Sequence, residues 1–142
     1  MYKKYLYFII LILLIFLLCC SDSSSNKPTP ANVTLSNTNL QFETHAEWYA
    51  DDLIWATGTA SNSGQSRAYN IKVQSTLYDA NHVSLGQSMW QKVLDTLDGG
   101  TSKGFTAMWA DSSKTLATKC KYYKLDVQWD TVPSILKSDN DN

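Results

Sequence analysis

The segment AYNIKVQSTLYD, Ala68–Asp79, decides the expected fold of this chain. Within it Ile71, Val73, Ser75 and Leu77 alternate with side chains that suit a solvent-facing surface. A period of two places these four residues on one face of a β-strand, and that face is expected to be buried. The alternation is unbroken, and strand-like segments lie on both sides of it. We therefore predict a central strand.

Shorter segments with strand-like patterns flank this one along the chain. The other expected strands are Asn32–Leu35 together with Asn39–Tyr49, then Leu53–Ser61, Val83–Leu94, Thr101–Ala110 and Lys121–Asp130. Turn signals such as Asp98-Gly99-Gly100 separate them, Asp111–Lys119 is expected to form a helical turn or a loop, and no segment has a long helical stripe. The pattern predicts an all-β protein, an antiparallel β-sandwich of about seven strands.

The amino end has the form of a secretory signal. A basic start, Met1–Lys4, precedes the apolar run Leu6–Leu18, which is shorter than the ~20 residues of a spanning helix. The run stops at Cys19 and Cys20, before a serine-rich segment, and so resembles a prokaryotic lipoprotein signal peptide. The resemblance implies lipidation of Cys20, with Cys19 as the alternative. An uncleaved membrane anchor helix remains open, and either interpretation places the domain outside the cytoplasmic membrane, at the cell surface or in the periplasm.

These features divide the chain into four parts. Residues 1–20 are the expected signal peptide, and residues 21–31, SDSSSNKPTPA, have the composition of a flexible tether. Residues 32–137 are the expected folded domain, and residues 138–142 are expected to be a disordered tail.

Several short motifs are similar to those of the FxLYD domain family. They are Gly58-Thr59-Ala60-Ser61-Asn62, Ala68-Tyr69-Asn70-Ile71-Lys72-Val73, Leu77-Tyr78-Asp79-Ala80, Leu97-Asp98-Gly99-Gly100 and Phe105. Ser75 stands where the family has its name-giving Phe, and Ile71 replaces a common Val. The resemblance implies an immunoglobulin-like sandwich in a secreted or lipid-anchored protein, with no catalytic residues and no agreed ligand.

The motif residues have structural explanations. Gly58, inside a strand pattern, suggests a bulge or a close backbone approach. Asn62 and Asp79 suit side-chain hydrogen bonds to the backbone of a loop and of a hairpin turn. Leu77 and Tyr78 end the central strand. We expect these five residues to determine the fold.

The sequence gives no support for catalysis, metal binding or nucleic-acid binding. It contains no nucleophile elbow and no phosphate-binding glycine loop, so we expect that the protein is not an enzyme and uses no cofactor. The formal net charge is −1 and no basic block occurs. His45 and His82 are far apart, and Cys120 is expected to be a free thiol. The turn carboxylates, Asp51, Asp52, Asp95 and Asp98, are expected to be solvated rather than to bind calcium.

The aromatic residues leave the function open between two classes. Of five Trp, Trp109 and Trp129 share the parity of core residues, whereas Trp48, Tyr49 and Trp90 are candidate ligand-binding aromatics. If they are exposed, a carbohydrate-binding module is indicated; if they are buried, a module that binds an envelope protein is favoured. A structural spacer is a third option. The sequon at Asn32 matters only in a host that glycosylates secreted proteins.

Overall fold

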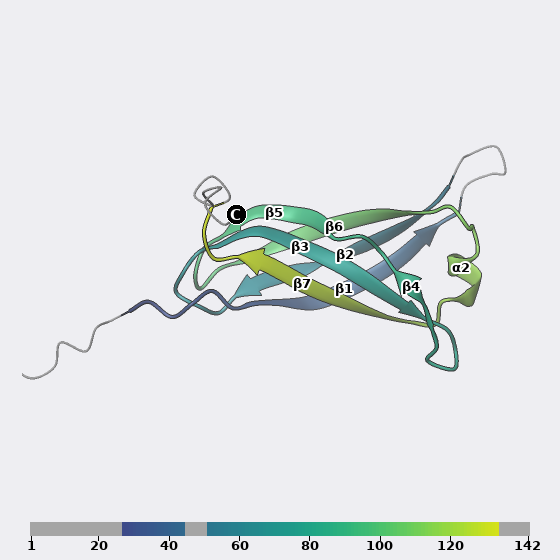
Figure 1. Cartoon of the computed structure of the whole chain (residues 1–142), viewed down its shortest axis with the longest axis horizontal. Helices are drawn as coiled ribbons and strands as arrows, with labels where there is room; N and C mark the ends of the chain where they lie inside the picture. The colour runs from purple at the N-terminus through teal and green to yellow at the C-terminus, as the bar shows by residue number, and fades with distance from the viewer. Residues whose placement is uncertain (1–26, 45–50, 134–142) are drawn as a thin grey trace, which may run out of the picture.

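The computed structural model describes residues 27–44 and 51–133. Within these ranges the chain forms seven strands and one short helix, arranged as two stacked antiparallel sheets (Figure 1). The elements are β1 (Val33–Glu43), β2 (Asp52–Asn62), β3 (Ala68–Tyr78), β4 (Ser84–Gln87), β5 (Gln91–Leu97), β6 (Ser102–Asp111), α2 (Leu116–Lys119) and β7 (Tyr122–Asp130). The predicted antiparallel β-sandwich is confirmed.

The strand order confirms that Ala68–Asp79 supplies a central strand. The first sheet has the order β1-β2-β6. In the second sheet β3 pairs with β7 along one side, and with β4 and β5 in succession along the other. The chain crosses between the sheets after β2, after β5 and after β6, which is the cross-sheet connectivity of immunoglobulin-like sandwiches.

The core lies between the sheets and follows the period-two pattern of the strands. Ile71, Val73, Ser75 and Leu77 are all buried on the inner face of β3. Opposite them, the inner faces of β2 and β6 contribute Ile54, Ala56, Ala60, Phe105, Ala107 and Trp109. Trp109 is thus a core residue, as predicted, and Trp129 is half-buried against the same cluster.

The predicted strand Val83–Leu94 is wrong, because the structure divides it into β4 and β5. At the break, Ser88 replaces a regular ladder partner: the Ser75 backbone N–H donates to Ser88 Oγ at 2.8 Å, and the Ser88 N–H donates to the Ser75 carbonyl at 2.9 Å. The next carbonyl, that of Met89, accepts the indole N–H of Trp109 at 2.9 Å. These hydrogen bonds to β3 and β6 fix the backbone between β4 and β5. Their partners are far apart in sequence, so a local pattern does not predict them.

The first strand is continuous where the sequence predicted two pieces. Its register against β2 shifts between Ser36 and Asn39, and Asn37 has a φ of +49°. The extra residues of this bulge lie opposite Gly58. The sequence predicted a bulge or a close backbone approach at Gly58; the structure has the bulge in the neighbouring strand, with the Ser36 carbonyl oxygen 3.1 Å from where a Cβ would lie, and it adds the ring of Phe105 from β6.

The folded domain begins before the expected boundary at Asn32. Thr29 exchanges hydrogen bonds with Gln65, and the Thr29 carbonyl also accepts the Ser66 N–H at 3.0 Å. Ala31 is 8% exposed and belongs to the core. The last residues of the predicted tether are therefore part of the domain.

Other predictions fall outside the described residues. These are the signal or anchor helix with Cys19 and Cys20, the aromatic pair Trp48 and Tyr49, and the tail 138–142. Among the residues that the structure does describe, no helix has both the length and the apolar character needed to cross a membrane.

Candidate functional site

The two ends of the sandwich differ in what they carry. At the N-proximal end, which we define by Val33, Asn62 and Leu97, β1 begins and β2 and β5 end. At the distal end, defined by Tyr78, Asp111 and α2, β3 and β6 end (Figure 1). The predicted tether precedes the first end, and the structure places a pocket at the second.

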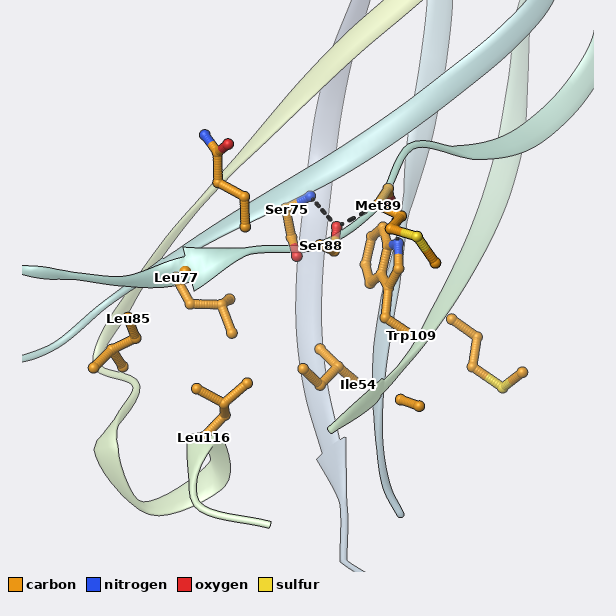
Figure 2. Close-up of a pocket in the computed structure, with 12 residues that line it drawn as sticks. Ile54, Ser75, Leu77, Leu85, Ser88, Met89, Trp109 and Leu116 are labelled. Atoms are coloured by element: carbon orange, nitrogen blue, oxygen red, sulfur yellow. Dashed lines mark hydrogen bonds between the residues drawn. The ribbon is translucent and has the colours of Figure 1, made fainter. Parts of the chain in front are cut away.

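The pocket opens between the two sheets at the distal end and has a volume of about 420 Å³. β2, β3 and β6 form its inner wall, and β4, the Ser88–Met89 segment and α2 surround it (Figure 2). The lining residues are Ile54, Ser75, Leu77, Leu85, Gly86, Gln87, Ser88, Met89, Met108, Trp109, Ala110 and Leu116. Apolar side chains predominate and none of these residues is charged, so the site suits an apolar group.

Ser75 is the unusual member of this lining. Its side chain is directed into the pocket from the inner face of β3 (Figure 2), and the residue is 1% exposed. Its hydroxyl has no hydrogen-bond partner among the described residues. A buried hydroxyl without a partner costs about 1–3 kcal/mol, and such groups are uncommon in native structures. Val73 and Leu77, the neighbours of Ser75 on the same face of β3, both carry buried apolar side chains.

Two hydrogen bonds fix the rim of the pocket. Gln91 Oε1 accepts a hydrogen bond from the backbone N–H of Met108 at 2.6 Å. This N–H is on the edge of β6 that pairs with no other described strand. Trp109 Nε1 donates to the Met89 carbonyl. The Ser88–Met89 segment is thereby tied to the opposite sheet, and Met89 is left 84% exposed.

Asp111 positions the wall formed by α2. Its carboxylate accepts the backbone N–H groups of Ser113 at 3.0 Å and Leu116 at 2.9 Å, and the hydroxyl of Ser113. Burial raises the pKa of Asp111, but the hydrogen bonds from Ser113, Leu116 and Thr115 outweigh it, so that the pKa lies below its ordinary value of 3.8. The ionised carboxylate thus holds Leu116 against the pocket.

The motif residues predicted to determine the fold are separated by the structure. Gly58 lies in mid-sandwich against Phe105. Asn62 is at the N-proximal end, where its amide pairs with Asn32, Gly64, Ser66 and Leu97.

The end of the central strand carries the other three. Leu77 lines the pocket. The next residue in the chain, Tyr78, is half-buried. Asp79 Oδ1 accepts the N–H groups of Asn81 and Val83 in the turn that follows.

The other candidate residues are not gathered at one site. Trp90 is 40% exposed and follows the pocket residue Met89, whereas Cys120 is a half-buried free thiol. No group of three metal-ligating side chains occurs in the described ranges.

The pocket itself was not foreseen from the sequence. Met89, Met108 and Leu116 reach it from a strand break, an edge strand and a single helical turn, none of which gives a periodic signal. One signal was present: Ser75 is the polar residue in an otherwise apolar face of the central strand.

No protein-family model matches the chain, and a search of curated proteins gives no match. Two solved structures are similar to it. One is a Bordetella pertussis protein described as ApaA, with 15% identity and a TM-score of 0.38 over 59% of this chain and 71% of that one. The other is a DUF1425 family member from Shewanella sp. pv-4, with 15% identity and a TM-score of 0.36 over 68% of this chain and 94% of that one.

Proposed function

We propose that this protein is a non-catalytic binding module of the cell envelope, anchored by a lipid on Cys20, and that its distal pocket receives an apolar ligand. The observation that carries the proposal is the uncharged pocket of about 420 Å³ with the unpartnered Ser75 hydroxyl in its wall. A concave, mostly apolar site with a few polar groups is the common form of a small-molecule site.

The position of the pocket suits an anchored module. The lipoprotein-like signal and the FxLYD-type motifs favour attachment at the amino end. β1 begins at the N-proximal end (Figure 1), and the lining residues place the pocket at the other end. A tether at residues 21–28 would therefore leave the pocket facing away from the membrane.

The proposal can be tested through the methionines. The chain contains three, of which Met89 and Met108 line the pocket and Met1 belongs to the expected signal segment. The full chain, labelled with ¹³C at the methionine methyl groups and placed in lipid nanodiscs, is titrated with naphthalene. We expect saturable shifts of the Met89 and Met108 signals. Absence of saturable shifts would overturn the proposal.

Two variants locate the binding. Ser75→Phe fills the pocket from its inner wall, and Leu116→Lys places a charge in the wall formed by α2, where no residue is fully buried. Both should abolish the Met89 shift, and the second does so without changing a buried position. Retained shifts in Leu116→Lys would place the binding elsewhere.

A carbohydrate-binding function is the second candidate, and the exposed ring of Trp90 favours it. The full chain in nanodiscs is incubated with purified envelope polysaccharide and pulled down, alongside Trp90→Ala. Tyr122→Ala, which removes an exposed aromatic from β7, is the control. Retention that is lost only in Trp90→Ala would support sugar binding in place of the pocket function.

A further inference from the structure

We infer that the pocket selects an uncharged aromatic compound carrying one oxygen group that hydrogen-bonds to Ser75 Oγ. This inference rests on the proposed function and names the class of ligand that the distal pocket takes. The three parts of the description, namely the oxygen group, the absence of charge and the aromatic ring, each follow from a different set of lining residues.

The oxygen group follows from the hydrogen bonds around Ser75. The neighbouring hydroxyl, Ser88 Oγ, accepts the Ser75 backbone N–H at 2.8 Å and donates to the Met89 carbonyl at 3.3 Å. The nearby amide of Gln87 donates to Thr76 Oγ1 at 3.2 Å. These groups have other partners, and no described residue hydrogen-bonds to Ser75 Oγ, so an oxygen group bound in the pocket can supply the missing partner.

The absence of charge follows from the lining as a whole. None of the twelve residues that surround the pocket is ionisable as Asp, Glu, Lys, Arg or His. The nearest carboxylate along the chain, that of Asp111, accepts hydrogen bonds from the Ser113 hydroxyl and from the turn that leads into α2. A charged group would lose its hydration here without gaining a partner, so the part of the ligand inside the pocket is neutral.

The aromatic ring follows from the side chains at the mouth. Met89 places a thioether there, and Trp109 places an indole ring beside it (Figure 2). Thioether sulfur makes favourable contacts with aromatic rings, and methionine adapts its shape to a flat ligand. The indole ring adds a flat surface for offset stacking.

The test compares 1-naphthol with naphthalene, which differ by one hydroxyl, on the labelled full chain in nanodiscs. The ratio of their affinities is measured for the wild type, for Ser75→Ala and for Ser36→Ala, which removes an exposed hydroxyl on β1 as a control. The Ser75→Phe chain supplies the background of probe dissolved in lipid. We expect Ser75→Ala to lower the relative affinity for 1-naphthol roughly fivefold, with naphthalene binding unchanged, which is the effect of one hydrogen bond.

The outcomes separate this inference from the proposed function. An unchanged affinity ratio in Ser75→Ala, with naphthalene still bound, would overturn the inference and leave the pocket function standing. An equal loss in Ser36→Ala would also overturn it. If neither compound shifts the Met89 and Met108 signals, the proposed function fails, and the inference fails with it.

Discussion

Phe105 in β6 packs directly over Gly58 in β2. A Cβ placed on Gly58 would lie 2.8 Å from Cε1 and 2.9 Å from Cζ of the phenylalanine ring, and 3.1 Å from the Ser36 carbonyl oxygen. The two residues are opposite each other in the β2–β6 register. The ring therefore occupies the space that any side chain at position 58 would need, and the β1 bulge lies on the other side of the same glycine.

Gly58→Ala should destabilise the domain by about 1–3 kcal/mol, because a methyl group overpacks the core against the ring. Denaturant unfolding measures the change. Gly104→Ala is the matched control, since a Cβ there meets its nearest atom at 3.9 Å. Combining Gly58→Ala with Phe105→Leu should cost less than the sum of the single changes. Strict additivity would show that the ring is not the obstacle.

Leu77→Ala should cost about 2–5 kcal/mol, because Leu77 is buried on the inner face of β3. The loss should fall near the lower limit, since the side chain borders a pocket rather than being packed on all sides. Ile71→Ala removes a fully buried side chain on the same face and should cost more. A Leu77→Ala loss under about half a kcal/mol would contradict its assignment to the core.

Acid should weaken the distal end through Asp111. Its folded-state pKa is lowered below 3.8, so its contribution to stability is present above that pH and is lost as the pH falls through the folded-state value. Asp111→Asn should therefore destabilise the domain by about 1–3 kcal/mol at pH 7, and the difference from the wild type should shrink in strong acid.

Chemical denaturation at a series of pH values measures this difference. Asp95→Asn is the control, because it removes a carboxylate that pairs with Lys92 on the exposed surface and is expected to change stability little. A wild-type advantage over Asp111→Asn that persists undiminished into strong acid would contradict the role given to the carboxylate.

Cys20→Ala should abolish lipid attachment and release the protein from the membrane fraction, if Cys20 carries the lipid. Incorporation of radiolabelled fatty acid, followed by fractionation, measures both effects. Cys120→Ala serves as the control, since that thiol is in the folded domain. Unchanged incorporation in Cys20→Ala would reject this residue as the lipidation site, and loss in Cys19→Ala alone would move the assignment by one position.

The strand pattern by itself determined the fold class. The alternation of Ile71, Val73 and Leu77 is a local property with a period of two, and a strand with one buried face requires it. A glycine within a strand pattern likewise indicates that another part of the protein packs closely against it. At Gly58 that part is the ring of Phe105. The alternation depends on residues close together in sequence and was predictable for that reason, whereas the identity of the neighbour at Gly58, Phe105 of another strand, was not.

The tertiary structure alone decided where the strands break and where a ligand can bind. The division between β4 and β5 depends on hydrogen bonds from Ser88 to β3 and from Trp109 to Met89, partners 13 and 20 residues away in the chain. The pocket is formed by side chains from β2, β3, β4, β6 and α2 that no single period relates. In the sequence, Ser75 is one small residue in a strand. Only the packing of two sheets leaves its hydroxyl buried, unpartnered and beside the pocket.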